Sequence, residues 1–258
     1  MKLDIVVRTH SRGNVHNAKE WGERYVGAPK NEVMFRCVNS LVTSINLAEA
    51  DIRVWVLDDS SDEASLQTLH TIINKCRYPT ELIQLPPEQC GVQGSALAQF
   101  EAGKTYGREV VYFVEDDYLH TSSAIQEMID MYELGKKNTK GKEVALFPCD
   151  YPDRYQPGGI KSSFIVYGSR RHWRTIQEST NTCMLSHALL VAHWHQFETL
   201  ARNYQLDPAV TEENTVNTVW REHAVLFSPI PSLALHVQFK QHKDPYIDWK
   251  SWWDAARY

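Results

Sequence analysis

The feature that most constrains this chain is a short apolar run that stops at three acidic residues. Residues 110–114 are β-branched or aromatic, and Glu115, Asp116 and Asp117 follow at once. The run predicts a strand buried on both faces. Adjacent carboxylates repel one another unless a cation or strong donors compensate, which favours a hard divalent metal bound through oxygen. The alternative is that the acids only cap or solvate the next helix, although residues 121–123 can supply that cap without them.

A second predicted strand also ends in acidic residues. Residues 52–57 are mostly apolar, and Asp58 and Asp59 follow them. In open α/β sheets, ligands gather beyond the carboxyl ends of the strands. Two strand-acid-helix units therefore predict two acidic strand ends on one edge of a parallel sheet. A carboxylate at this position can accept a hydrogen bond from a ribose hydroxyl or a base N–H.

Basic residues and a glycine add weaker signals at the same predicted edge. Arg8 and Arg12 lie where the first predicted strand, residues 3–9, runs into a polar turn, and they could meet a phosphate or a base. Gly94 belongs to a turn predicted to open a helix over residues 96–106. A glycine there lets the backbone approach an anion, but the pattern is neither GxGxxG nor GxxxxGK, so it is weak evidence for phosphate binding.

The order of these segments resembles the nucleotide-sugar-binding half of a GT-A glycosyltransferase of the family-2 type. The similarity covers residues 3–120, and the acids after residue 114 have the E-D-D form of the D-x-D motif of such enzymes. The resemblance implies an α/β fold in which a Rossmann-like, mostly parallel central sheet is flanked by helices. It also implies a nucleotide-diphospho-sugar donor, a UDP-sugar first of all, and Mn²⁺ or Mg²⁺. Such an ion would neutralise the leaving diphosphate.

The resemblance also implies roles for single residues. Asp58 or Asp59 would touch the base or the ribose, Glu115 the ribose side, and Asp117 the metal. The donor-contacting set would be Arg8, Thr9, Arg12, Asp58, Asp59, Gly94, Glu115 and Asp116. Such families often take a further metal ligand, frequently His, from near the C-terminus, and His236 follows a short apolar run there. The alternative is a hydrogen-bonded structural histidine at a strand end.

A general base is expected at the start of a helix in the second half of the chain. Glu212 and Glu213 match that place, with Glu213 preferred, although the family usually has Asp there. The alternative is that the helix dipole alone favours acids in a first turn. A base opposite the leaving diphosphate predicts a single displacement with inversion at the anomeric carbon. Retention would need a second carboxylate as nucleophile, and none is evident in the sequence.

A predicted hairpin over residues 162–174 carries a basic, aromatic tip. Arg170, Arg171 and Trp173 are the candidate acceptor-binding residues, or else they form a solvated turn. Stand-alone transferases of this kind include phage enzymes that glycosylate hydroxymethylated pyrimidines in DNA, and this cluster could hold phosphates and one stacked base. The net charge of -5 counts against DNA. A protein, glycan or small-molecule hydroxyl is the alternative acceptor.

Length and composition limit the remaining choices. The 258 residues suit a single domain, with residues 1–120 as the donor half, 121–240 as the acceptor and catalytic half, and 241–258 as an aromatic tail that packs on the body or closes over the donor. No apolar stretch reaches the roughly 20 residues of a membrane span, and the first residues are not a signal peptide, so a cytoplasmic protein is expected. Five scattered cysteines predict free thiols. The oligomeric state is not indicated.

Two other classes of protein remain open at this level. A nucleotidyltransferase would share the sheet and the acids, but it should carry a glycine-rich loop with Arg or Lys after the first strand, and residues 9–13 match that loop poorly. A nucleotide-binding module without activity would keep Asp58, Asp59 and Asp117 and would need no base.

Overall fold

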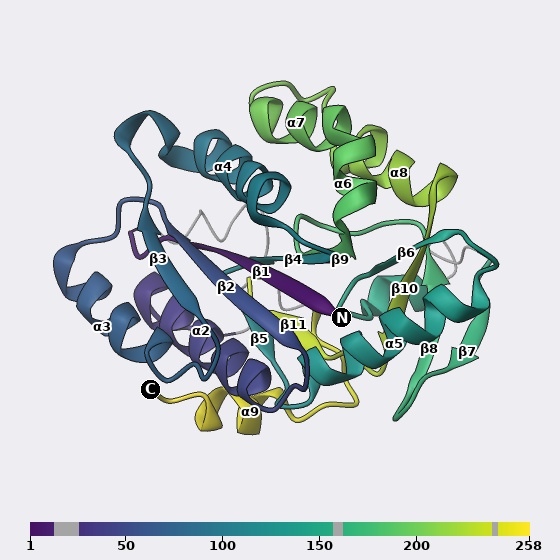
Figure 1. Ribbon diagram of the computed structural model, residues 1–258. Coiled ribbons are helices and arrows are strands. Elements are labelled where there is room, and N and C mark those ends of the chain that lie inside the picture. The colour runs from purple at the N-terminus through teal and green to yellow at the C-terminus, as the bar shows by residue number, and fades with distance from the viewer. Residues whose placement is uncertain (13–25, 157–161, 239–241) are drawn as a thin grey trace.

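The computed structural model describes residues 1–12, 26–156, 162–238 and 242–258. Within them, a nine-stranded sheet has the order β3-β2-β1-β4-β9-β6-β10-β8-β7, and helices cover both of its faces (Figure 1). The strands are β1 (Lys2–Thr9), β2 (Asp51–Asp58), β3 (Thr80–Gln84), β4 (Val110–Glu115), β6 (Glu143–Leu146), β7 (Ile165–Tyr167), β8 (His172–Ile176), β9 (Cys183–Ser186) and β10 (Ala224–Ile230). A separate pair consists of β5 (Tyr118–His120) and β11 (Ala234–His236).

The helices form two layers. Figure 1 shows α4, α6, α7 and α8 on one side of the sheet and α2, α3, α5 and α9 on the other. Their bounds are α2 (Lys30–Asn46), α3 (Glu63–Ile73), α4 (Gly91–Tyr106), α5 (Ala124–Asn138), α6 (His187–Ala192), α7 (Trp194–Asn203), α8 (Val216–Glu222) and α9 (Trp249–Ala255), with short 3-10 turns η1 (Pro87–Gln89), η2 (Pro152–Tyr155) and η3 (Glu212–Asn214). No helix in the described part of the chain is both long and apolar enough to cross a bilayer.

The first half of the sheet is parallel, as the two strand-acid-helix units predict. β1 pairs in parallel with both β2 and β4, and β2 pairs in parallel with β3. β9 enters antiparallel between β4 and β6, and β8 and β7 extend the sheet as an antiparallel hairpin. The predicted α/β architecture, a central sheet flanked by helices, is confirmed, and so is the hairpin predicted over residues 162–174.

The core explains why the strongest sequence signals were correct. In β4, the side chains of Val110 to Val114 are 2% exposed or less, so the run is apolar at every position and not at alternate ones. One boundary differs from the prediction. α4 begins at Gly91, five residues before the expected start at Ala96. The thiols are free as predicted, and three of the five are buried.

The aromatic tail of the chain packs on α2, as the first of the two alternatives predicts. Trp249 of α9 is 0% exposed and belongs to an apolar cluster with residues of α2, β5 and β11. Arg36 lies 4.8 Å from the ring centroid of Trp253, and the rings of Phe35 and Tyr258 meet edge to face at 5.0 Å. Both views place α9 beside α2, so the described tail, residues 242–258, is part of the folded body.

His120, at the end of β5, makes stability depend on pH. The ring is 1% exposed. Nδ1 lies 2.9 Å from the carbonyl oxygen of Tyr118, and Nε2 lies 2.8 Å from the hydroxyl of Tyr112. Burial lowers the pKa of His120 to about 4 from the ordinary 6.5. The unfolded chain therefore binds this proton more readily, and stability is lost as the pH falls from 6.5 towards 4.

We expect the free energy of unfolding to fall by about 2 kcal/mol between pH 7 and pH 5 through this one residue. Urea denaturation at the two pH values measures it. The difference should shrink in His120→Gln and should persist in His70→Gln, because His70 is exposed on α3. An unchanged pH dependence in His120→Gln would contradict the assignment.

Candidate active site

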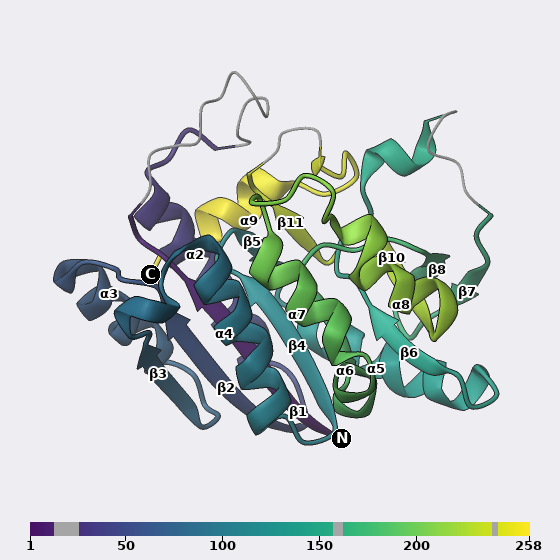
Figure 2. The same ribbon diagram turned by 90° about the horizontal axis from the view of Figure 1, so that it is seen from above.

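The carboxyl ends of β1, β2 and β4 bring the predicted acids to one edge of the sheet. Thr9 lies opposite Asp58, and Arg8 lies opposite Glu115, in the parallel register. Figure 2 shows α4 and α7 lying across β1 and β4 on one face. The three consecutive acids at the end of β4 nevertheless have three different environments.

Glu115 forms an ion pair with Arg8. The Arg8 Nη2 to Glu115 Oε1 distance is 2.6 Å, and the two side chains are 16% and 20% exposed. Arg8 Nη1 also reaches the carbonyl oxygen of Val92 and Oγ of Ser95, at 3.3 and 3.4 Å. Burial raises the pKa of Glu115, although Arg8 opposes the shift. Arg8 therefore joins the β4 acid to the first turn of α4.

Asp116 links the end of β1 to the start of α2 through two hydrogen bonds. It accepts hydrogen bonds from the backbone N–H of His10, at 2.8 Å, and from Nζ of Lys30. Burial tends to lower the pKa of Lys30, but the carboxylates of Asp116 and Asp117 outweigh burial and raise it. The predicted donor contact of Asp116 stays a prediction. In the structure, its charge is balanced by Lys30, which no sequence pattern singled out.

Asp117 and His236 meet across the β5–β11 pair. Oδ2 of Asp117 lies 3.2 Å from Nε2 of His236, whereas Oδ1 is buried and has no hydrogen-bond partner among the described residues. Burial would raise the pKa of Asp117, but His236, Lys30 and Arg8 hold it well below its usual value. An unsatisfied buried carboxylate oxygen beside an imidazole is a donor set that suits Mn²⁺ or Mg²⁺. The metal role of this pair stays a prediction, and the geometry is compatible with it.

Two tyrosines fix the ring of His236. The ring stacks on Tyr118 with centroids 4.6 Å apart, and Nδ1 lies 3.5 Å from the hydroxyl of Tyr151. Burial opposes protonation of His236, but Asp117 and Glu115 together raise its pKa. Tyr118 follows the acids directly and could have been proposed from its position. Tyr151 lies far away in the sequence and carries no comparable signal.

Asp58 and Asp59 are occupied by hydrogen bonds within the protein. Asp58 is 1% exposed, and its two oxygens accept from Oγ1 of Thr9 at 3.0 Å and from the N–H of Ser61 at 2.9 Å. Both oxygens of Asp59 lie 3.0 Å from the N–H of Gly91, at the start of α4. In this structure Asp58 and Thr9 tie β1 to β2 and are almost fully buried, and their donor contacts stay predictions. Asp59 is 5% exposed and also serves as an anchor.

Gly94 and Arg12 do not support the predicted phosphate contact. A Cβ at Gly94 would lie 2.7 Å from the backbone of Gln89, so this glycine permits close packing of α4 on η1 and not the approach of an anion. Arg12 is exposed at the end of its described segment, and its donor contact stays a prediction.

The two candidate bases have different surroundings. Glu213 is exposed and pairs with Arg221, with Oε1 and Nη1 2.5 Å apart. Glu212 is partly buried, and its charge acts on Tyr204 together with that of Glu115. Burial, followed by these two carboxylates, raises the pKa of Tyr204 to about 12. Tyr204 is held near α4, because its carbonyl oxygen accepts from Nε2 of Gln93. Glu212 is thus the less exposed of the two, and the role of either residue as the base stays a prediction.

The predicted acceptor cluster is not assembled. Trp173 is 1% exposed and so cannot stack on a ligand. Arg171 binds the carboxylate of Glu127 at 2.6 Å and the carbonyl oxygen of Pro231 at 2.6 Å, so it joins β8 to α5. Arg170 is exposed. The hairpin was predicted correctly, but Arg171 attaches it to α5 and Trp173 packs in the core.

Neither a protein-family model nor a curated protein matches this chain. Solved structures do resemble it. TarS of S. aureus matches with a TM-score of 0.52 and 16% identity over 88% of this chain and 36% of TarS. TarS 1–349 in complex with UDP-GlcNAc matches with a TM-score of 0.50 and 17% identity over 88% of this chain and 58% of the other.

A third match is the glycosyltransferase GlyE of Streptococcus pneumoniae TIGR4, with a TM-score of 0.53 and 8% identity over 99% of this chain and 60% of GlyE. The chain thus spans about a third to three fifths of the proteins it resembles. At these identities the likeness establishes the fold, which is a glycosyltransferase fold.

Proposed function

We propose that this protein is a glycosyltransferase that moves a sugar from a uridine diphosphate sugar to an acceptor hydroxyl with inversion. The observation that carries the proposal is the contact of Asp117 with His236, in which one buried carboxylate oxygen has no partner in the described chain. This contact lies at the carboxyl edge of a sheet shared with a glycosyltransferase. The UDP and UDP-GlcNAc complexes of TarS support a uridine donor.

Asp117 and His236 are the residues that would hold Mn²⁺ or Mg²⁺. No group of three or more His, Cys, Asp and Glu side chains suitable for a metal exists among the described residues. The remaining ligands would therefore come from the donor diphosphate and water, which is how Mg²⁺ commonly binds beside substrate phosphates. Bound there, the ion would supply Lewis acidity that neutralises the leaving diphosphate.

The protein's own charges complement a diphosphate at this position. Lys30 and Arg8 both act electrostatically on Asp117, so two cations lie within reach of an anion placed beside it. Each is already paired with a carboxylate, Asp116 or Glu115, which fixes its direction. In this proposal the pairs orient the cations, and the diphosphate joins an existing network of charges.

Glu212 is the proposed general base. It lies on η3, and its charge acts on Tyr204, as does that of Glu115. A carboxylate that removes the proton of the acceptor hydroxyl opposite the leaving group leads to one in-line displacement and inversion. The C–O bond to the diphosphate breaks as the bond to the acceptor oxygen forms, and the proton passes to Glu212.

A DNA acceptor is not the acceptor that we favour. That hypothesis relied on Arg170, Arg171 and Trp173, of which Trp173 is buried and Arg171 is bound to Glu127. The net charge of -5 also opposes binding to a polyanion. A protein, glycan or small-molecule hydroxyl is the better match.

Thermal unfolding with nucleotide sugars tests the proposal. UDP-GlcNAc with Mn²⁺ should raise the melting temperature, because a ligand that binds only the folded state stabilises it. At 100 times Kd the gain is about 2.7 kcal/mol, or roughly 5–10 °C for a domain of this size. UDP-GlcNAc with EDTA should give a much smaller rise, and ATP with Mn²⁺ should give none.

Equal rises with ATP and UDP-GlcNAc, or no effect of Mn²⁺, would contradict the proposed donor site. A rise with UDP-GlcNAc but no release of UDP, with or without acceptors, would instead identify a nucleotide-binding module without transferase activity.

A further inference from the structure

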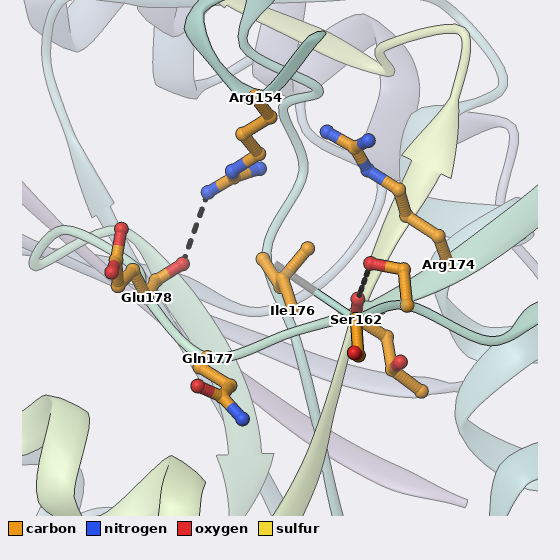
Figure 3. A pocket seen from close by; sticks show the side chains of 8 residues that line it. Arg154, Ser162, Arg174, Ile176, Gln177 and Glu178 are labelled. Carbon is orange, nitrogen blue, oxygen red and sulfur yellow. Dashed lines mark hydrogen bonds between the residues drawn. The ribbon is translucent and has the colours of Figure 1, made fainter. Parts of the chain in front are cut away.

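A small pocket lies between η2 and β8, beyond the acid cluster. Its volume is about 40 Å³, enough for a group the size of a phosphate or carboxylate. Figure 3 shows two arginine side chains, Arg154 and Arg174, extending on the same side of the pocket. The lining residues are Arg154, Ser162, Ser163, Arg174, Thr175, Ile176, Gln177 and Glu178.

Arg154 is partly buried and has no carboxylate hydrogen-bond partner among the described residues. Its guanidinium donates to the carbonyl oxygens of Cys149 and Glu178, at 3.2 and 3.0 Å, and to Oγ of Ser228 at 3.5 Å. Burial lowers the pKa of Arg154, and the nearby Arg174 adds to this. The charges of Asp150 and Asp153 oppose this shift, but the acceptors that the guanidinium contacts directly are neutral, and an oxyanion in the pocket would give it a charged one.

Arg174 is also short of acceptors. It is 8% exposed, and its Nη2 lies 2.6 Å from Oδ1 of Asp150. Nε is buried and has no hydrogen-bond partner in the described chain. A guanidinium has five N–H donors in a planar fork that suits an oxyanion. The two arginines therefore offer many more donors than the surrounding acceptors use. Glu178 lies at the opposite side of the view from Arg174 (Figure 3).

One aromatic ring separates this pocket from the candidate metal ligands. The guanidinium carbon of Arg154 lies 5.4 Å from the centroid of Tyr151, whose hydroxyl lies 3.5 Å from Nδ1 of His236. The chain that leaves the pocket at Glu178 continues to Thr180, which binds the hydroxyl of Tyr118 at 2.8 Å. A molecule with one group in the pocket would thus extend towards the acid cluster.

We propose that the Arg154–Arg174 pocket binds an oxyanion, a phosphate or a carboxylate, carried by the acceptor. This inference rests on the proposed function and names its substrate class, an acceptor with an anionic group near the hydroxyl that receives the sugar. The pocket takes one such group, whereas duplex DNA would present a row of phosphates that needs an extended basic face. Exposed rings flank the pocket and could cover neighbouring sugar units, with Tyr155 55% and Phe164 77% exposed.

Titration with inorganic phosphate tests the pocket without relying on transferase activity. The full chain in EDTA is followed by NMR through the Nε–H signals of its arginines. Phosphate should shift the signals of Arg154 and Arg174 at saturable concentrations, and acetate should do the same if carboxylates are accepted. In Arg174→Gln the affinity should fall at least about tenfold, the equivalent of about 1.4 kcal/mol, whereas Arg257→Gln, at an exposed site, should bind as the wild type does.

Arg174→Lys covers the case in which Arg174→Gln fails to fold, because it keeps a charge beside Asp150 and loses the planar fork. Its phosphate affinity should also fall. Unmoved Arg154 and Arg174 signals, or equal phosphate affinity in the wild type and the Arg174 variants, would overturn the proposal even if UDP-GlcNAc binds normally.

A second measurement tests whether the pocket serves the acceptor. Glucose, glucose 6-phosphate and glucuronic acid are compared for their stimulation of UDP release from UDP-GlcNAc. One of the two anionic sugars should stimulate more than glucose, and which one does so distinguishes phosphate from carboxylate. The preference should be lost in Arg174→Gln and kept in Arg257→Gln. Equal stimulation by all three would refute the acceptor role. Failure of UDP-GlcNAc to bind at all would instead refute the proposed function.

Discussion

Replacing Asp117 with asparagine is expected to reduce sugar transfer by at least about 100-fold. The substitution keeps the size of the side chain but removes its charge, and with it the hard oxygen ligand opposite His236. A metal that polarises a leaving phosphate supplies several kcal/mol of transition-state stabilisation, and each 1.36 kcal/mol is worth about tenfold in rate. Release of UDP from UDP-GlcNAc, measured with saturating acceptor and Mn²⁺, gives the result.

Asp130→Asn is the matched control, since Asp130 lies on α5 and bonds to Gln126 and Ser169 at the surface. It should keep full activity. Asp117→Asn should also lose the extra thermal stabilisation that Mn²⁺ gives with UDP-GlcNAc. Normal turnover in Asp117→Asn, or an unchanged Mn²⁺ effect, would remove the basis for a metal at this place.

Glu212→Gln is expected to lower kcat by about 10² to 10⁴ while leaving UDP-GlcNAc binding intact, as the loss of a general base should. The adjacent Glu213→Gln is an unusually close control, because it changes the same functional group one residue away. Glu213 is exposed and paired with Arg221, so its substitution should leave kcat within a factor of about two, the range of an exposed ion pair.

Single-turnover rates and thermal shifts with UDP-GlcNAc separate chemistry from binding in these two variants. A large loss in Glu213→Gln with normal turnover in Glu212→Gln would restore the order predicted from the sequence alone. A loss of donor binding in Glu212→Gln would mean that this residue contacts the donor and does not act as the base.

The sequence predicted the donor half of the fold well because that half follows simple rules. β1, β2 and β4 are apolar and stop at polar residues, and parallel pairing then places their ends together. Strands β6 and β9, in the second half of the sheet, were missed. Each is only four residues long, too short for a periodic pattern to separate it from a helix or a loop.

The candidate site was predicted in part for a related reason. Residue type and position identified Asp117 and, through the family resemblance, His236. They could not show that Thr9 and Ser61 donate hydrogen bonds to the two carboxylate oxygens of Asp58, because tertiary contacts decide which groups become hydrogen-bond partners. The basic residues on the hairpin were chosen because they cluster in sequence, but alternation along a strand sends neighbours to opposite faces. Arg174 therefore lines the pocket, whereas Trp173 enters the core.

The contact between Asp117 and His236 joins residues 119 positions apart in the chain. A polypeptide still being translated has long since released its donor half from the ribosome when His236 is added. Until that moment the pair does not exist, so a nascent chain with a folded sheet edge would still lack one of the two proposed metal ligands.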